Sequence, residues 1–260
     1  MDLRLRGKIA LVTGGSRGLG RAICEGLAAE DAHVVVNYLC DRPRGIDLGD
    51  EADQLVGRLG AAFGARALAI PADISDSAQV EGLFSEILRQ LGPLDILVNN
   101  AGIWPTALAH EIEPVEFERV LRVNLLGSFL TCRAAVRSWL DEGRTGRIVN
   151  ITSPAAFQGS TTGHAHYAAS KAGLVSFSVS LAREVAPRGI HVNLVAPGMM
   201  RTEMSRQSLA RDEQHYVERI PLRRIADPAE IADVAVFLAS ERAGYMTGAT
   251  VDVTGGMLMR

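Results

Sequence analysis

Short apolar runs alternate along the chain with longer stretches in which apolar residues recur at helical spacing. The apolar runs are continuous rather than alternating, which is typical of strands that helices cover on both faces of a parallel sheet. They lie at residues 9–12, 34–36, 67–70, 94–98, 148–151, 190–195 and 249–253. The helical patterns lie at about 18–29, 51–63, 77–91, 115–141, 167–186 and 228–239. This order predicts an α/β fold built on a doubly wound, parallel, seven-stranded sheet.

The pattern contains no stretch that looks like a linker between domains and no internal repeat. We therefore expect one domain over residues 1–260. Two segments, 40–50 and 197–221, are polar or lack a clear period, and we expect both to be irregular. A long irregular segment in a compact domain is more often functional than a simple connector. We expect 197–221 to cover the substrate.

Composition excludes several classes of protein. Apolar residues make up 47% of the chain and charged residues 22%, which argues against disorder. A net charge of -3 gives no general attraction to nucleic acid or to acidic membranes. No apolar run reaches the ~18 residues that a membrane span needs. Three cysteines, far apart and without a CxxC motif, suggest a reducing cytoplasm rather than disulfides or zinc.

A glycine-rich turn, Thr13 to Gly20, follows the first strand and leads directly into a helix. Glycines allow a tight turn there and bring backbone N–H groups close to an anion at the helix N-terminus. The spacing G-x3-G-x-G differs from the common G-x-G-x-x-G, and an ordinary turn is the alternative. Its place at the first strand–helix junction favours a dinucleotide site of the Rossmann type.

The residues around the second strand bear on the choice between NAD and NADP. Sites for NAD usually place a carboxylate at the end of that strand, where it binds the ribose 2′-hydroxyl. Here the strand ends at Tyr38, while Arg17 lies in the glycine turn. A 2′-phosphate would be attracted by Arg17, although Asp41 lies nearby. We expect NADP(H), with NAD as the alternative.

Tyr167 and Lys171 are spaced four residues apart in a helical pattern, which puts the phenol and the ammonium on one face. A free tyrosine has a pKa near ~10 and is a poor acid or base at neutral pH. A nearby ammonium in a partly desolvated site stabilises the phenolate, helped by the positive charge of a nicotinamide. We therefore predict that Lys171 lowers the pKa of Tyr167. Many Y-x3-K pairs are, however, only surface pairs on a helix.

Two further polar residues stand near this pair. Ser153 follows the strand at 148–151, so its hydroxyl is expected at the carboxyl edge of the sheet, where ligands bind in open α/β folds. Asn124 is a polar residue in an otherwise apolar helical stretch, and a buried amide satisfied by backbone is its alternative.

Together these residues make the chain resemble the short-chain dehydrogenase/reductase family of the single-domain kind, including members that resemble 3-oxoacyl-carrier reductases. The resemblance covers essentially the whole chain. It rests on seven ordered motifs: Thr13 to Gly20, Asp73, Asn99-Asn100-Ala101-Gly102, Asn124, Ser153, Tyr167 with Lys171, and Pro197-Gly198 with Thr202.

The resemblance implies a role for each residue. Tyr167 would be the general acid or base, Lys171 would lower its pKa and bind the nicotinamide ribose, Ser153 would hydrogen-bond the reacting oxygen, and Asn124 would hold a water. The implied cofactor contacts are Gly14, Ser16, Arg17, Gly18, Leu19, Gly20, Tyr38, Asp73, Ile74, Asn100, Ala101, Gly102, Tyr167, Lys171, Pro197, Gly198 and Thr202. Asp73 as the start of the next helix, and Asn99 as a brace between strands, are alternatives.

The resemblance also implies an oxidoreductase that interconverts a ketone and a secondary alcohol. A non-catalytic dinucleotide-binding regulator or scaffold, or an NAD-dependent dehydrogenase of sugars, polyols or cyclic alcohols, are the alternatives. Candidate substrate residues, besides Ser153, are Trp104, Phe157, His164 and Met204. We expect His164 and His166 to line the cleft or face solvent, and we expect no metal, because no third ligand is near.

Expected partners are a small carbonyl or alcohol substrate and further copies of this chain. In family members that act on carrier-bound 3-oxoacyl groups, basic residues occupy the positions of Arg144 and Arg188, although Asp141 and Glu142 weaken the first. A carrier-bound acyl chain is therefore a second possible substrate. The resemblance implies a tetramer in which the apolar segment 244–259 packs with the helix at 167–186.

Overall fold

The strands and helices follow the apolar pattern closely in a computed structural model, which describes residues 2–160 and 163–259. Seven parallel strands form one sheet in the order β5-β2-β1-β6-β7-β8-β9. They are β1 (Ile9–Val12), β2 (His33–Tyr38), β5 (Ala67–Pro71), β6 (Ile96–Asn99), β7 (Gly146–Ile151), β8 (Ile190–Pro197) and β9 (Thr250–Val253). The predicted fold class is confirmed.

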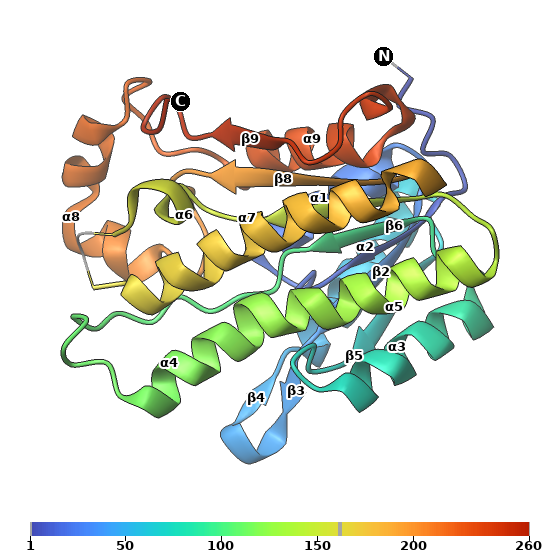
Figure 1. Cartoon of the computed structure of the whole chain (residues 1–260), viewed down its shortest axis with the longest axis horizontal. Coiled ribbons are helices and arrows are strands. Elements are labelled where there is room, and N and C mark those ends of the chain that lie inside the picture. The colour runs from blue at the N-terminus through green and yellow to red at the C-terminus, as the bar shows by residue number, and fades with distance from the viewer. Residues whose placement is uncertain (1, 161–162, 260) are drawn as a thin grey trace.

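Helices cover both faces of this sheet (Figure 1). The helices α1 (Gly18–Ala29), α2 (Gly49–Phe63) and α9 (Pro228–Ala239) pack on one face with alternate strand residues such as Val12 and Val36. The helices α3 (Ser77–Gln90), α5 (Gly127–Asp141) and α7 (Ala165–Val185) pack on the other, with Leu11 and Val35. Because successive residues of a strand point to opposite faces, a strand buried on both sides needs a continuous apolar run.

Capping residues fix where two of these helices begin. The carboxylate of Asp76 accepts hydrogen bonds from the backbone N–H groups of Ala78 and Gln79, at 2.8 and 3.1 Å. Asp227 forms a capping box with Glu230, and Pro228 occupies the first turn. Both arrangements satisfy N–H groups that a helix cannot pair internally.

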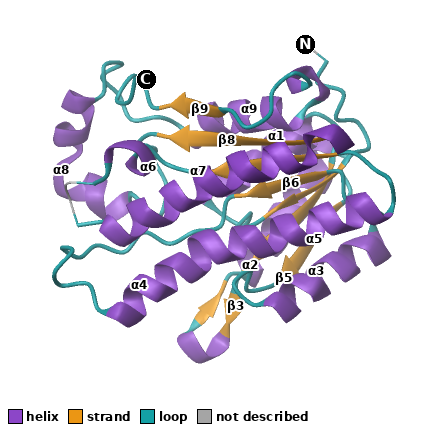
Figure 2. Ribbon diagram, in the orientation of Figure 1, coloured by secondary structure: helices purple, strands orange, loops and turns teal. Residues whose placement is uncertain are grey.

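The two segments expected to be irregular contain regular structure. Residues Cys40–Asp41 (β3) and Ile46–Asp47 (β4) form a small antiparallel hairpin around a 3-10 turn, η1 (Arg42–Arg44), which projects from the sheet near β5 (Figure 2). Residues Arg206–Arg219 form α8. The prediction failed here because α8 is mostly polar: Leu209 is its one buried residue, and only Tyr216 and Val217 of the same helix pack in the hydrophobic cluster around it.

The helix expected at 115–141 is not continuous. It consists of α4 (Pro114–Leu121), a π-helical turn η2 (Arg122–Leu126) and α5. A π-turn takes one residue more than an α-turn and is often found at functional sites. Its central residue is Asn124.

Candidate active site

The expected site residues gather at the carboxyl edge of the sheet, where β1, β6, β7 and β8 end. Gly14 follows β1, Asn100 follows β6, Ser153 follows β7, and Gly198 follows β8. These four strands are neighbours in the sheet, and all are parallel. Parallel strands that end at one edge bring the loops after them together, which is the usual ligand position in open α/β sheets.

Tyr167 and Lys171 lie one turn apart on α7 and face the end of β7. The Lys171 Nζ lies 5.7 Å from the centroid of the Tyr167 ring. The same Nζ donates a hydrogen bond of 2.8 Å to the carbonyl oxygen of Ile151, the last residue of β7. Lys171 is only 4% exposed. The strand therefore fixes the position of the ammonium beside the phenol.

Burial shifts the pKa values of both Tyr167 and Lys171. Burial raises the pKa of this phenol above its ordinary value, and the hydrogen bond with Ser153 only partly offsets that effect. Burial also lowers the pKa of Lys171 to about 8. For each group, removal from water is the largest influence on its pKa. The expected lowering of the Tyr167 pKa by Lys171 included help from the positive charge of a bound nicotinamide, and it stays a prediction.

Asn124 is fully buried in the π-turn and hydrogen-bonds with the loop that follows β6. Its Oδ1 accepts a hydrogen bond of 2.9 Å from the N–H of Ile103, and its Nδ2 donates to the carbonyl of Ile103 at 3.0 Å. Nδ2 also donates to the hydroxyl of Ser170, at 3.1 Å. The amide thus ties α7 to this loop.

Gly102 shows how closely this loop approaches the site. A Cβ at this position would lie 3.2 Å from the Oδ1 of Asn124 and 3.7 Å from the Nζ of Lys171. Asn124 and Lys171 therefore face the same point of the loop from opposite sides, and a side chain there would disturb both.

The glycine turn has the geometry of an anion site. Gly14 and Gly18 have φ values of +60° and +53°, which favour glycine. A Cβ at Gly20 would lie 2.1 Å from the carbonyl oxygen of Gly14, so the helix start and the turn touch. The residue before α1, Arg17, provides no side-chain hydrogen bond to cap the helix. The first N–H groups of α1 therefore remain available for a ligand.

Ser16 supplies a second, independent indication of a ligand at this turn. The residue is 3% exposed, and its Oγ is buried without a hydrogen-bond partner among the described residues. A buried hydroxyl normally has a partner. The combination of this hydroxyl with an uncapped helix start fits the pyrophosphate of a dinucleotide.

Thr13 is a residue that the sequence analysis did not single out individually. Its hydroxyl accepts hydrogen bonds from the N–H groups of Asn100 and Ala101, at 3.0 and 3.1 Å. Asn100 returns the contact, because its Nδ2 donates to the carbonyls of Thr13 and Gly14, both at 3.0 Å. The available signal was a polar residue directly after an apolar strand.

Three of the implied cofactor contacts, Tyr38, Asp73 and Ile74, lie at or after the ends of β2 and β5. The carboxylate of Asp73 accepts hydrogen bonds from the N–H and the hydroxyl of Ser75, at 2.9 and 2.7 Å. Ile74 is 4% exposed and packs with Val80 and Leu130, so its side chain belongs to the core. Tyr38 pairs in register with Pro71 at the end of the strand.

Asn99 braces two strands, as the alternative reading held. Its Nδ2 donates to the Oδ1 of Asn150 at 2.9 Å, and its Oδ1 accepts from the hydroxyl of Thr131 at 2.7 Å. These hydrogen bonds connect β6 to β7 and β6 to α5 beneath the site.

The segment that follows β8 reaches over the glycine turn. A Cβ at Gly18 would lie 3.3 Å from the Oε2 of Glu203 and 3.4 Å from the Cβ of Thr202. The hydroxyl of Ser205 shapes this segment by donating to the carbonyl of Met200 at 2.6 Å. Gly198 is fixed in turn, because its N–H donates to Val253 in β9 at 2.9 Å.

Of the expected substrate residues, Trp104 lies beside the phenol of Tyr167 and stacks on His164. The rings of Trp104 and His164 stack with centroids 4.4 Å apart, and the centroids of Trp104 and Tyr167 are 6.3 Å apart. Phe157 and Met204 are 36% and 53% exposed.

His166 departs from its expected place. It is fully buried, and neither ring nitrogen has a hydrogen-bond partner among the described residues. Burial lowers its pKa, while the nearby charge of Glu116 on α4 raises it. The expectation that it lines the cleft or faces solvent is wrong, because this side of α7 packs against α4.

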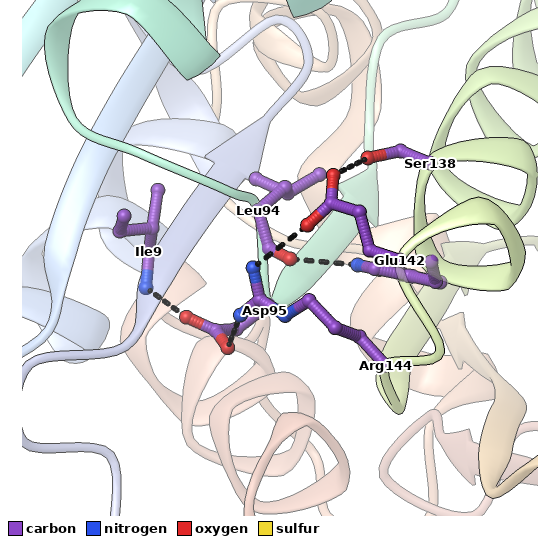
Figure 3. Close-up of polar contacts among 7 residues, drawn as sticks. Ile9, Leu94, Asp95, Ser138, Glu142 and Arg144 are labelled. Carbon is purple, nitrogen blue, oxygen red and sulfur yellow. Dashed lines mark hydrogen bonds and ion pairs between the residues drawn. The ribbon is translucent and has the colours of Figure 1, made fainter.

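The two basic positions considered for a carrier protein lie at the opposite edge of the sheet from Ser153. Arg144 precedes β7 and Arg188 precedes β8, whereas Ser153 follows β7. Figure 3 shows Arg144 held by Asp95, at 2.8 Å, and by Glu142, at 3.6 Å. Asp95 also accepts the backbone N–H of Ile9, at 2.9 Å. Both neighbouring carboxylates therefore already pair with this guanidinium.

Comparison with known proteins identifies the class. The family model described as Enoyl-(Acyl carrier protein) reductase matches residues 14–258. The chain therefore belongs to the short-chain dehydrogenase/reductase family, as its motifs suggested. It is an oxidoreductase that acts on CH–OH and C=O groups.

Particular relatives cover the whole chain. It is 39% identical over 257 residues to the 3-oxoacyl-[acyl-carrier-protein] reductase FabG of Aquifex aeolicus (strain VF5), covering 99% of this chain and 100% of the relative. The chain is 40% identical to the FabG of Escherichia coli (strain K12) over 257 residues, which again cover 99% of this chain and 100% of the relative. A short-chain type dehydrogenase/reductase from Mycobacterium marinum superposes with a TM-score of 0.91 at 33% identity, covering 100% of this chain and 98% of that one.

The membrane expectation can be examined directly in the structure. Among the residues it describes, none of the helices combines the length and the apolar character that a membrane crossing requires.

Proposed function

We propose that this protein interconverts a ketone and a secondary alcohol with NADP(H), and that Tyr167 donates or accepts the proton. The observation that carries the proposal is the cluster at the end of β7. There the phenol of Tyr167 hydrogen-bonds with Ser153, and the buried Lys171 lies one helical turn away, with its Nζ 5.7 Å from the ring. A protein that only binds a dinucleotide needs no such proton donor.

Each residue has a distinct part in this proposal. Hydride transfer to a carbonyl creates an alkoxide, and a bound nicotinamide dinucleotide supplies that hydride. Ser153 and Tyr167 donate hydrogen bonds to the oxygen where the negative charge develops, which lowers the barrier. Tyr167 then delivers its proton. Lys171, held by the carbonyl of Ile151, returns a proton toward the phenol, and Asn124 is the residue that positions the loop beside both.

The dinucleotide would lie across the carboxyl edge. Ser16 and the first N–H groups of α1 would bind the pyrophosphate, with Leu19 and the glycines of the turn allowing close approach. Asn100, Ala101 and Gly102 would line the cofactor. Asp73, Ile74 through its backbone, and Tyr38 would lie at the adenosine end, and Pro197, Gly198 and Thr202 at the nicotinamide end.

The preference for NADP rests on charge. Arg17 is exposed beside the turn, and β2 ends at Tyr38 without an acid. A 2′-phosphate carries about -1.5 to -2 charges, so an exposed arginine nearby favours it. Arg44 in the hairpin is already paired with Asp41, at 3.2 Å, which leaves Arg17 as the better candidate. Replacement Arg17→Ala should lower the ratio of kcat/KM for NADPH over NADH about tenfold, at 1.4 kcal/mol per factor of ten.

The activity itself is tested by loss of absorbance at 340 nm with a panel of ketones and both cofactors. A carrier-bound 3-oxoacyl chain is the second candidate substrate, which the names of the relatives favour. An enoyl thioester belongs in the panel because of the description of the matching family. Tight cofactor binding without turnover of any compound would instead favour a regulator or scaffold.

The remaining parts of the proposal concern assembly and access. We propose one domain in which 197–221 covers the bound substrate, with Met204 in that segment and Phe157 on the opposite wall. We also propose a cytoplasmic homotetramer that involves α7 and the C-terminal segment. Light scattering during size-exclusion chromatography tests this, and a species of 27.8 kDa would contradict it.

A further inference from the structure

A stack of two rings, those of Trp104 and His164, stands beside the proposed proton donor. Trp104 follows β6, and His164 immediately precedes α7. Their rings are 4.4 Å apart between centroids and inclined by only 26°. The indole thus stacks on His164 and also lies beside the phenol of Tyr167, with the two ring centroids 6.3 Å apart.

Three backbone contacts hold the loop of Trp104 to the loop of His164. The imidazole Nδ1 lies 2.9 Å from the carbonyl oxygen of Pro105, a distance at which it donates a hydrogen bond. The N–H of Ala107 donates to the carbonyl of Gly163 at 2.8 Å, and Ala107 and His164 form a parallel β-bridge. A Cβ at Gly163 would lie 3.0 Å from the backbone of Ala107, so the two loops are in close contact.

The stack is fixed before any substrate arrives. His164 is 5% exposed, whereas Trp104 remains partly exposed. A flat ring that is already held in place loses little conformational freedom when a ligand binds against it. The part of the indole left accessible is therefore a rigid apolar surface on a side chain that lies beside Tyr167, and we call it the aromatic wall.

The wall is also uncharged. Residues 100–108 and 163–167 contain no lysine, arginine, aspartate or glutamate. Burial lowers the pKa of His164, so its imidazole is neutral at pH 7. Nothing in these two loops would pair with a phosphate or a carboxylate on the substrate.

We infer that Trp104 selects uncharged carbonyl compounds that carry an aromatic ring next to the carbonyl, and that His164 is the positioning residue that holds the indole in place. This inference rests on the proposed function, because it places the aromatic ring of the substrate on Trp104 while its carbonyl meets Tyr167. Stacked aromatic pairs are worth about 0.5–1.5 kcal/mol beyond their buried area. A saturated ring of the same size lacks that share.

Phenyl methyl ketone and cyclohexyl methyl ketone form a matched pair of substrates for the test. The measured quantity is the ratio of their kcat/KM values, so that their different intrinsic reactivity cancels between variants. Trp104→Leu should lower the ratio of aromatic over saturated ketone about 5- to 10-fold, mostly through KM. Trp104→Phe keeps a flat ring and should change it less than twofold. An unchanged ratio in Trp104→Leu would overturn the inference.

The role of His164 has its own pair of variants. His164→Ala removes both the stack and the hydrogen bond to Pro105, and should lower the same ratio, mostly through a higher KM for the aromatic ketone. His164→Asn retains a donor for Pro105 and should recover part of the loss. Equal losses for both ketones in both variants would show a merely structural role.

Fluorescence separates failure of this inference from failure of the proposed function. The chain has two tryptophans, and Trp139 is fully buried, with its Nε1 donating to the carbonyl of Leu94. The difference between wild type and Trp104→Phe therefore reports Trp104. Phenyl methyl ketone, added with oxidised cofactor, should quench this signal more than the cyclohexyl compound does. Stronger quenching by the phenyl compound without turnover of any ketone would refute the proposed function but support the aromatic wall. Turnover of ketones with equal quenching by the phenyl and cyclohexyl compounds would support the proposed function but refute the aromatic wall.

Discussion

The two halves of the carboxyl edge are built in different ways. On the side of β1, the glycine turn is held by backbone groups and by side chains that bind backbone, such as Thr13 and Asn100. On the side of α6 (Ala155–Gln158) and α8, Phe157 and Met204 instead expose their side chains to solvent. A backbone site recognises a ligand shared by a whole family, whereas exposed side chains distinguish one substrate from another.

The largest expected effect lies where the two halves meet. Tyr167→Phe removes the proposed proton donor and should lower kcat for ketone reduction at least ~10²-fold, the range of a general acid. Binding of NADPH, followed by the change in cofactor fluorescence, should persist. Tyr245→Phe removes a hydroxyl from a fully exposed tyrosine and serves as the control. Full turnover in Tyr167→Phe would refute its assignment.

The glycine turn, which is the half held by backbone groups, should tolerate no added side-chain atom at Gly20. In Gly20→Ala the new Cβ would lie 2.1 Å from the carbonyl of Gly14 and 2.6 Å from the amide of Asn100. We expect at least a tenfold weaker dinucleotide affinity in calorimetry, with about 1–3 kcal/mol lost from the free energy of unfolding.

Gly57→Ala is the matched control for that substitution. Gly57 is exposed within α2, and an added Cβ meets no atom within 4 Å. Alanine should stabilise this helix by about 0.5–1 kcal/mol without changing affinity. If the two variants bound the dinucleotide equally well, the close fit of the turn would be irrelevant to binding.

The pH dependence of reduction should follow Lys171. Its pKa is lowered to about 8 by burial, so the ammonium exists below that pH and is lost above it. Since the phenol is resupplied with protons from this side, kcat should fall about tenfold per pH unit above pH ~8. Lys171→Arg keeps its charge at high pH and should remove that decline, even if its rate is lower. A flat wild-type profile from pH 6 to 10 would contradict the proton path.

The smallest effect concerns the segment that joins the two halves. The carboxylate of Glu203 lies over Gly18, where the pyrophosphate would bind. Two unit charges ~4 Å apart in water interact by about 1 kcal/mol, so Glu203→Gln should lower the Kd for NADPH roughly fivefold, less at high salt. Glu218→Gln, in α8 of the same segment, should leave the Kd unchanged. A weaker affinity in Glu203→Gln would mean that the carboxylate helps to bind the cofactor.

How much could be predicted from the sequence differs between the same two halves. The apolar runs located every strand of the seven-stranded sheet, because strands buried on both faces leave a continuous signal. The glycine turn could also be recognised from the sequence, because its geometry restricts the residue type: only glycine fits at Gly20. Asp76 and Asp227 cap the starts of α3 and α9 with their side chains, which is a determinant of the same local kind.

The remainder depended on packing that one sequence does not display. The chain shows that Tyr167 and Lys171 share a helix face, but the net pKa of the phenol depends on how far β7 and its loop exclude water. The stack of Trp104 on His164 joins residues 60 positions apart, so no local pattern announces it. The helix α8 was missed because its residues are mostly exposed and polar.

The π-turn at Arg122–Leu126 has a practical consequence for anyone who engineers this protein. The turn has one residue more than an α-helical turn, and it places the amide of Asn124 where it hydrogen-bonds with the backbone of Ile103. Deleting one residue to make the helix regular would improve its internal ladder but turn that amide away. Gains in thermal tolerance are therefore best sought elsewhere, because we propose that this amide positions the loop beside the reacting groups.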